Sequence, residues 1–167
     1  LFVIGPLILG STMLATHAAG TTSTFSTKSS SASSVSSSNC GSWNFASGQN
    51  IGSGNNQLVA VTTISANNVW AVGYYYDYNS TPRTLIEQWS GTSWNIVPSP
   101  NYGPGANYLM GVTQVPGTHQ IWAVGYHDDS NYNFSYPLIE QWNGTRWNII
   151  SGPSITGILN GVVAVSG

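Results

Sequence analysis

The sequence is unusually poor in charged residues. Asp, Glu, Lys and Arg supply 5% of its 167 residues, whereas they make up roughly a quarter of an average soluble domain. The three basic residues, Lys28, Arg83 and Arg146, form no basic stripe, and the formal net charge is -2. Because proteins neutralise nucleic-acid phosphates with clustered Lys and Arg, this composition argues against nucleic acid as a partner. The Ser, Thr, Asn, Gly and aromatic residues that fill the polar positions instead are typical of secreted β-rich proteins.

Cysteine is nearly absent as well. Cys40 is the single thiol, which excludes a disulfide within the chain and a zinc site built on several cysteines. We interpret Cys40 as an unpaired thiol at the edge of a domain, and a disulfide between chains stays open as an alternative.

The sequence also lacks an apolar run long enough for a membrane span, which needs about 20 residues. Residues 1–20 begin with "LFVIGPLILGSTML", a run that Gly5, Pro6 and Gly10 interrupt. They are predicted to be a signal peptide truncated at its N-terminus, with a residual membrane anchor as the alternative. Residues 21–40 are dominated by Ser and Thr and are predicted to be a flexible linker. The protein is therefore expected to be secreted or attached to the cell surface, with a membrane contacted only through an uncleaved N-terminal segment.

No stretch after the linker has a helical period, but the chain repeats itself about every 50 residues. Equivalent tryptophans are Trp70 and Trp122, Trp89 and Trp142, and Trp94 and Trp147. Matching segments begin at Leu58, Leu109 and Leu159. The pentapeptide "LIEQW" occurs in both complete units and contains Glu87 in the first and Glu140 in the second.

Each complete unit holds four short runs with strand character, separated by turn-forming residues. The runs of the first unit, residues 57–98, are 57–64, 68–75, 84–90 and 93–98. The runs of the second unit, residues 108–151, are 108–115, 120–126, 137–143 and 146–151. A lone fourth strand is predicted at residues 42–47. The start of a further unit is predicted at residues 158–167, with a strand from Leu159 to Val165.

Four antiparallel strands that recur about every 50 residues are what a β-propeller blade requires. The runs "VWAVGY" and "IWAVGY" are apolar on both faces, which fits a strand between two neighbouring blades. We therefore predict an all-β fold, a β-propeller fragment over residues 41–167 with two complete blades and partial blades at both ends. A longer protein is expected to supply the other blades, and a ring assembled from several copies is the alternative. A solenoid and a β-sandwich are the competing architectures.

The repeat resembles the kelch, or galactose-oxidase-type, propeller repeat. That family places a glycine at the end of the second strand, an aromatic residue in the third strand and a Trp at the start of the fourth. The matching residues are Gly73 and Gly125, Trp89 and Trp142, and Trp94 and Trp147. The second glycine of the family's usual doublet is replaced by Tyr74 and Tyr126, so the units are more similar to the divergent repeats of secreted bacterial proteins. Structural roles are also assigned to the other recurring residues, Trp70, Trp122, Glu87 and Glu140.

Glu87 and Glu140 are the first candidates for chemistry, because glycoside hydrolysis needs two carboxyl groups. Their equivalent positions in a repeated strand favour a structural role, such as accepting hydrogen bonds from a neighbouring strand or loop. His119 and His127 are interpreted as exposed loop residues because no third metal ligand is identifiable. No nucleophile elbow or sialidase-type motif is present. We therefore predict no catalytic residue and no cofactor in this stretch.

One pattern is similar to a calcium loop. Asp129, Asn131, Asn133 and Glu140 stand at positions 1, 3, 5 and 12 of that pattern. The glycine that the loop requires is replaced by Phe134, and flanking helices are not expected. We therefore predict no metal site.

The connections between the second and third strands, "YYYDYNSTPR" and "YHDDSNYNFSYP", are long, polar and rich in Tyr. They differ where the surrounding strands agree. Variable loops on a rigid scaffold commonly bind ligands, and Tyr has an apolar face and a polar tip that suit sugars or proteins. Loops that only keep the protein soluble are the alternative. The candidate binding residues are Tyr76, Asp77, Tyr78, Asn79, His127, Asp128, Asp129, Asn131 and Tyr132.

The sequence thus favours an extracellular, non-catalytic module that binds a polysaccharide or another protein. One alternative is a part of a secreted carbohydrate-active enzyme, an oxidase or a hydrolase, whose catalytic residues lie beyond Gly167. The other alternative is a structural spacer at the cell surface. The sequence leaves the oligomeric state open.

Overall fold

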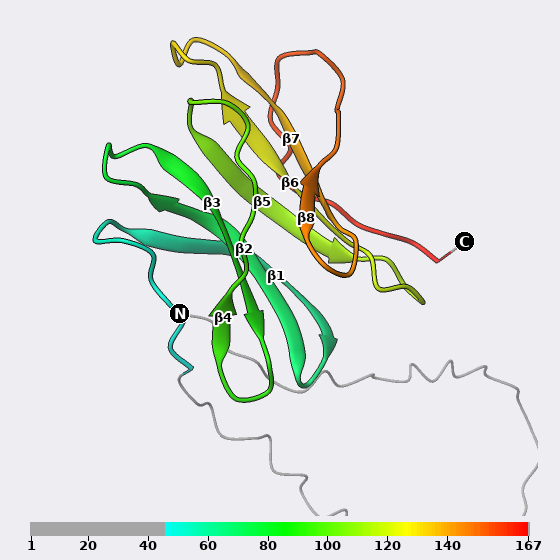
Figure 1. Ribbon diagram of the computed structural model, residues 1–167. Coiled ribbons are helices and arrows are strands. Elements are labelled where there is room, and N and C mark those ends of the chain that lie inside the picture. The colour runs from blue at the N-terminus through cyan, green and yellow to red at the C-terminus, as the bar shows by residue number, and fades with distance from the viewer. Residues whose placement is uncertain (1–45, 167) are drawn as a thin grey trace, which may run out of the picture. The chain divides into compact units, whose positions relative to one another are not determined.

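Residues 46–166, which the computed structural model describes, fold into two four-stranded antiparallel sheets, one for each complete repeat (Figure 1). The strand order is β1-β2-β3-β4 in the first sheet and β5-β6-β7-β8 in the second. The strands of the first sheet are β1 (Asn56–Ser65), β2 (Asn68–Tyr76), β3 (Pro82–Trp89) and β4 (Trp94–Ile96). Those of the second sheet are β5 (Asn107–Gln114), β6 (Ile121–Asp128), β7 (Ser135–Trp142) and β8 (Trp147–Ile149).

The all-β fold predicted from the sequence is confirmed for the described residues, and each of the eight predicted runs overlaps one strand. No helix in this part of the chain is long and apolar enough to cross a membrane. The predicted signal segment (1–20), the linker (21–40) and residues 42–45 of the lone strand lie outside the described residues. Residues 46 and 47, the last two of that strand, are described and belong to no strand.

The central strands β2 and β6 are apolar because both of their faces are covered. In β2, Val69, Ala71 and Val72 are 0% exposed although their side chains alternate between the two faces. In β6, Ile121 and Ala123 are buried on one face and Val124 on the other, where Trp122 is half-buried. Such double-sided burial is the reason that these strands are continuous apolar runs instead of alternating ones.

The two sheets pack face to face through a single apolar cluster. Trp70, Val72 and Ile86 of the first sheet contact Leu109, Ile121, Ala123, Leu138 and Trp147 of the second. The ring of Trp70 lies 5.0 Å from that of Trp142 and 5.6 Å from that of Trp147, with tilted and edge-on geometries that favour aromatic pairs. The recurring tryptophans therefore join one repeat to the next.

A glycine lies opposite a β-bulge in each sheet. Gly73 pairs with Leu58, and Gly125 pairs with Leu109, and in both cases the register of the first strand shifts at the next residue. The bulge brings a backbone carbonyl over the glycine Cα, so a Cβ atom at Gly73 would lie 1.9 Å from the oxygen of Gln57. The glycine of the repeat is therefore required by close backbone contact.

The segment after β8 differs from its prediction. Residues 159–165, expected as a strand, form no strand in the structure. Leu159 N–H donates to the carbonyl of Gly125 at 3.2 Å, and Gly157 N–H donates to that of Ser135 at 2.8 Å. These bonds hold the segment against the second sheet, but the described residues offer it no antiparallel partner with which to form a ladder. Val163 and Val165 are consequently 82% and 80% exposed.

Candidate functional site

All nine tyrosines of the chain lie at one end of the two sheets, which we call the tyrosine rim. The rim consists of residues 74–82, 101–108 and 126–136, at the upper left of Figure 1, where β2 and β6 end and β3, β5 and β7 begin. The hairpins β3–β4 and β7–β8, with four tryptophans at their turns, lie at the opposite end. The tyrosines are Tyr74, Tyr75, Tyr76, Tyr78, Tyr102, Tyr108, Tyr126, Tyr132 and Tyr136.

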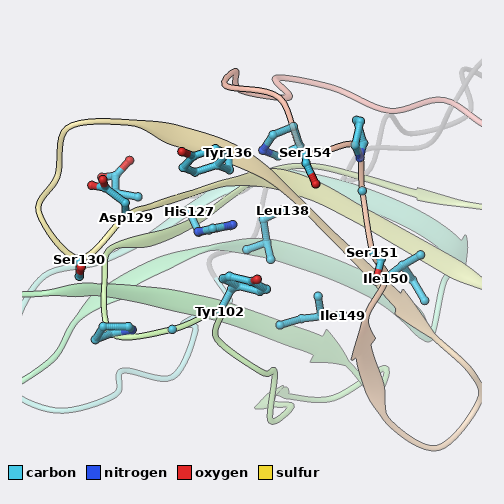
Figure 2. Close-up of a pocket in the computed structure, with 16 residues that line it drawn as sticks. Tyr102, His127, Asp129, Ser130, Tyr136, Leu138, Ile149, Ile150, Ser151 and Ser154 are labelled. Carbon is cyan, nitrogen blue, oxygen red and sulfur yellow. The ribbon is translucent and has the colours of Figure 1, made fainter.

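A pocket of about 580 Å³ opens at this rim beside the second sheet. Three segments form its walls: the connector that precedes β5 (residues 102–104), the end of β6 with its loop (127–130), and the chain around and after β8 (149–154). Leu138, Ile149 and Ile150 supply apolar surface between them (Figure 2). The volume lies within the range of roughly 300–1,000 Å³ that is usual for small-molecule sites.

Three aromatic rings form a continuous stack along the pocket. The ring of His127 lies 4.1 Å from that of Tyr102 at an angle of 29°, and 5.7 Å from that of Tyr136 at 24°. Figure 2 shows the imidazole between the two phenol rings. The Tyr102 side is open, because this residue is 54% exposed. A ligand can therefore contact an aromatic ring whose orientation is already fixed.

Asp129 supplies an acceptor to the pocket. Its Oδ1 accepts a hydrogen bond from Asn133 N at 2.8 Å, and no donor of the described residues contacts its Oδ2. The side chain of Asp128 is on the other face of β6, where its Oδ1 accepts from Ser135 Oγ at 2.7 Å and its carboxylate lies near Tyr108 and Tyr126. The exposed Ser130 lines the pocket beside Asp129. The site therefore offers acceptors to a ligand that carries hydroxyl or amino donors.

Both β2–β3 and β6–β7 loops are built on the same aspartate turn. Oδ1 of Asp77 accepts hydrogen bonds from Asn79 N and Thr81 N, and Asp129 makes the corresponding bond with Asn133. Ser80 and Tyr132 occupy equivalent positions with φ of 58° and 57°, a region that non-glycine residues seldom adopt. The two loops thus share a backbone shape and differ in the side chains that they present.

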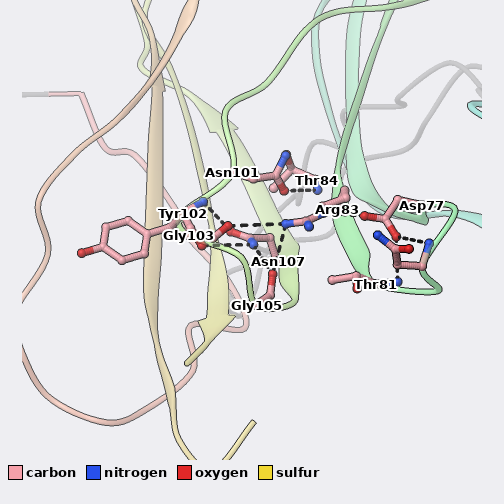
Figure 3. Close-up of polar contacts among 10 residues, drawn as sticks. Asp77, Thr81, Arg83, Thr84, Asn101, Tyr102, Gly103, Gly105 and Asn107 are labelled. Atoms are coloured by element: carbon pink, nitrogen blue, oxygen red, sulfur yellow. Dashed lines mark hydrogen bonds and ion pairs between the residues drawn. The ribbon is translucent and has the colours of Figure 1, made fainter. Parts of the chain in front are cut away.

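Arg83 of the first sheet holds the connector that forms one wall of the pocket (Figure 3). Its Nε donates to Asp77 Oδ2 at 2.9 Å, and its Nη1 reaches the carbonyl oxygens of Gly105 at 3.3 Å and Gly103 at 3.5 Å. The backbone N–H of Thr81 and the Arg83 guanidinium together keep the pKa of Asp77 below its usual value. The first repeat therefore positions part of the binding wall of the second.

An asparagine folds each connector back on itself. The buried side chain of Asn107 accepts from Tyr102 N at 2.8 Å and donates to the carbonyl of Gly105 at 2.8 Å. Asn56 makes the same contacts with Ile51 and Gly54 before β1. The connector is therefore part of the repeat, as the strands are. In the second repeat it places Tyr102 at the pocket.

Arg83→Met is expected to lower the free energy of unfolding by about 1 kcal/mol, because an ion pair and hydrogen bonds to two carbonyl groups are lost from a partly buried site. Urea denaturation followed by tryptophan fluorescence measures the change. Arg146→Met is the matched control, since Nε of Arg146 donates only to Asn148 Oδ1 on the exposed opposite end. Equal losses in the two variants would contradict a positioning role for Arg83.

Four other tyrosines form a second cluster across the two sheets. Tyr74 lies 4.9 Å from Tyr108 and 5.9 Å from Tyr76, and Tyr108 stacks on Tyr126 at 4.6 Å. Burial raises the pKa of Tyr108 to about 12, and the neighbouring Tyr126 contributes to this increase as the second cause. Burial raises the pKa of Tyr126 as well. The hydroxyls of Tyr108 and Tyr126 therefore stay protonated at neutral pH, so each can donate as well as accept a hydrogen bond.

The repeated glutamates lie inside the sheets and do not line the pocket. Glu87 is 1% exposed and Glu140 is 0% exposed. Oε2 of Glu140 accepts from Ser99 Oγ at 2.8 Å, and the backbone N–H of Gln49 donates to Glu87. Each glutamate thus binds the connector that precedes its own sheet. Burial raises the pKa of both carboxyl groups, that of Glu140 to about 8.

The structure distributes the predicted binding residues over several places. His127, Asp128 and Asp129 line the pocket. The prediction that His127 is an exposed loop residue is wrong, because it lies half-buried in β6 between two tyrosine rings. Tyr76 belongs to the tyrosine cluster, and Asp77 closes its loop with Asn79. Three others lie in the loops away from the pocket lining: Tyr78, which is 100% exposed, Asn131, and Tyr132, which is 57% exposed.

Some residues that line the pocket were not among the predicted ones: Tyr102, Tyr136 and residues 149–154. A signal for Tyr102 exists in the sequence. The stretches that end at Leu58 and Leu109 align without gaps, and Tyr102 is the aromatic residue that stands opposite Ile51.

The calcium-like pattern does not come together in space. Glu140, its last position, pairs with Ala123 and Ile149 inside the second sheet, five residues along β7 from the loop that holds Asp129. At roughly 3.3 Å per strand residue, this separation is far greater than a metal–ligand distance. Within residues 46–166, no group of three or more His, Cys, Asp or Glu side chains is arranged to hold a metal ion.

Comparison of the chain with models of protein families, with curated proteins and with solved structures gives no match.

Proposed function

We propose that the protein is a kelch-like β-propeller module of the cell surface or the extracellular space that binds carbohydrate, without catalysis, in the pocket of the tyrosine rim. The observation that supports it best is the stack of Tyr102, His127 and Tyr136 in a pocket that Asp129 also lines. A sugar ring has apolar C–H faces and a belt of hydroxyl donors. Such a ligand matches an exposed aromatic ring flanked by carboxylate oxygens.

The concave shape of the site favours a saccharide over a protein partner. A stable protein interface buries roughly 800 Å² on each partner and is usually broad. The walls of this pocket come from three short segments, and its volume of about 580 Å³ suits the end of an oligosaccharide chain. A protein partner is therefore the second candidate, and the exposed Tyr78 and Tyr132 of the loops are its most favourable contacts.

The propeller architecture is supported by the repeated way in which each unit meets the next. β5 packs on the first sheet. The segment that begins at Leu159, which is equivalent to Leu109 of β5, lies on the second sheet through the bond to Gly125 and a close approach of Gly161 to Gly111. Successive blades of a propeller repeat their contacts in this way. An extracellular location is supported by the low charge and by the predicted signal and linker segments of residues 1–40.

A glycan microarray with the full chain tests the proposal. We expect binding to at least one class of oligosaccharide, and a loss of roughly two- to tenfold in affinity for Tyr102→Ala, because stacking on one aromatic ring contributes about 0.5–1.5 kcal/mol. Tyr78→Ala is the matched control, since it removes a tyrosine of the rim that does not line the pocket. Absence of binding across the array, or equal losses in both variants, would reject the proposal.

A further inference from the structure

Three asparagines begin the motif Asn-X-Ser/Thr, which accepts N-linked glycans on secreted proteins when X is not Pro. They are Asn79, Asn133 and Asn143, in the stretches "NST", "NFS" and "NGT". The first two lie in the β2–β3 and β6–β7 loops, the third lies in the β7–β8 turn, and all three are exposed. Because a transferase also needs the hydroxyl of the third residue, the surroundings of each motif determine whether it can be used.

The motif of Asn143 lies at the tip of an open turn. Asn143, Gly144 and Thr145 are all exposed. Oδ1 of Asn143 accepts hydrogen bonds from Thr145 Oγ1 at 2.9 Å and from the backbone N–H groups of Thr145 and Arg146 at 3.0 Å. Among the described residues, Nδ2 of Asn143 has no hydrogen-bond partner. The nitrogen that would carry a sugar therefore takes no part in the turn, and its modification leaves these hydrogen bonds intact.

The motif of Asn79 lies in a loop that Asp77 closes. Oδ1 of Asp77 accepts from the backbone N–H groups of Asn79 and Thr81 at 2.9 and 3.0 Å. Within residues 46–166, no hydrogen bond uses the side-chain amide of Asn79 or the hydroxyl of Thr81. Tyr78, which precedes Asn79, is 100% exposed. The loop thus keeps its shape without the two side chains that a transferase would bind.

The motif of Asn133 is different, because its hydroxyl is already in use. Ser135 is the first residue of β7, is half-buried, and donates a hydrogen bond from Oγ to Asp128 Oδ1 at 2.7 Å. The folded chain therefore presents two usable motifs, those of Asn79 and Asn143. Neither asparagine lines the pocket, so sugars at these positions are compatible with a ligand in it.

Attached sugars also suit a surface with so little charge. Charged residues supply 5% of the chain and the net charge is -2, so electrostatic repulsion between copies is weak. An N-linked glycan is bulky and hydrophilic and keeps a surface soluble without charge. A glycan on Asn79 would lie next to the fully exposed ring of Tyr78.

We propose that Asn79 and Asn143 carry N-linked glycans. The proposal rests on the extracellular location proposed above, because this modification belongs to proteins that leave the cytoplasm. The donor is an oligosaccharide joined through a diphosphate to a lipid. Nδ2 of the asparagine forms a bond to C1 of the first sugar and the bond from C1 to the diphosphate oxygen breaks. The lipid diphosphate leaves with the electron pair of that bond, and the amide loses one proton.

The test is glycopeptide mass spectrometry of the full-length protein, purified from the cells that produce it. We expect the peptides of Asn79 and Asn143 to carry the mass of a glycan. The peptide region of Asn131 should not, because this asparagine is equally exposed but lacks the motif. Thr81→Val and Thr145→Val leave both asparagines in place, and each should abolish the glycan at its own site. Thr145→Ser preserves the hydroxyl and should retain the glycan.

The first repeat allows a site to be added. Ser90 occupies in the β3–β4 turn the position of Asn143, is exposed, and is followed by Gly91 and Thr92. Ser90→Asn completes the motif and should add a third glycan. Protein from the medium or the cell surface without a glycan on Asn79 and Asn143, or with glycans that Thr→Val leaves unchanged, would overturn the modification but not the location. Protein confined to the cytoplasm would reject both.

Discussion

Gly125→Ala is expected to lower the free energy of unfolding by at least about 4 kcal/mol, which is beyond the cost of most single substitutions. A Cβ atom at this position would lie 1.9 Å from the carbonyl oxygen of Tyr108 and 2.9 Å from the Cα of Leu109. Both are backbone atoms of a bulged strand, so the clash cannot be relieved by turning a side chain. Gly73→Ala should have a similar effect, since its Cβ would meet the carbonyl of Gln57 at the same distance.

Chemical denaturation monitored by tryptophan fluorescence measures this loss. Gly152→Ala is the matched control, because its Cβ would have its nearest contact at 3.4 Å, with the flexible end of Ile139. That variant should stay within about 1 kcal/mol of the unmodified protein. If Gly125→Ala and Gly152→Ala were equally stable, the close backbone contact that defines each repeat would be absent.

The protein is also expected to lose stability as the pH rises from about 5 to 8. Burial raises the pKa of Glu140 from 4.5 to about 8, and the hydrogen bond from Ser99 only partly opposes it. Between these values the folded protein retains a proton that the unfolded chain has released. The contribution of Glu140 to the free energy of unfolding is therefore fully present below pH 4.5. It decreases by roughly 4 kcal/mol as the pH rises to 8. Glu87 contributes with the same sign, because burial raises its pKa too.

Urea denaturation at pH 5, 6.5 and 8 measures this dependence. Glu140→Gln still accepts the bond from Ser99 but cannot ionise, so its stability should vary much less over this range. Its buried amide N–H groups lack an acceptor and should cost about 1–3 kcal/mol at pH 5, so the comparison is between slopes and not between absolute stabilities. An unmodified protein whose stability stays constant or increases from pH 5 to 8 would show that Glu140 is not buried as a neutral acid.

The strands were predictable because their signals are local. Apolar runs bounded by turn residues locate β2 and β6, and the repeat itself places the same four strands in the second unit. The repeat also identifies Gly73 and Gly125, although the physical reason for them, a carbonyl brought close by a bulge, appears only in the structure. The strand expected at residues 159–165 is wrong because a strand needs a partner as well as a pattern, and the described residues supply none.

The pocket was only partly predictable because it depends on contacts between segments far apart in the chain. His127, Asp128 and Asp129 were identified from the unusual composition of their loop. Tyr102 and Tyr136 were not, because their positions depend on how the connector crosses the second sheet. Nothing in the sequence near Tyr102 indicates that Arg83, in the preceding repeat, bonds the connector that follows Tyr102.

The two loops use their equivalent aspartates differently. Asp77 of the first loop appeared to be available, yet the structure uses this carboxylate to close the loop and to pair with Arg83. The equivalent Asp129 has no arginine beside it, because Tyr136 occupies the position of Arg83 in the second repeat. A single exchange between the repeats thus leaves Asp129 without the ion pair that Asp77 makes.

Binding at the tyrosine rim is the central claim, and an NMR titration of the isotope-labelled full chain with the oligosaccharide that binds most strongly on the glycan microarray tests it most directly. We predict that shift changes concentrate in the amides of Tyr102, His127, Asp129, Ser130 and Ser151, which surround the pocket. The amides of the β3–β4 and β7–β8 turns should not change. Shifts centred on those turns, or no shifts at millimolar ligand, would contradict the account.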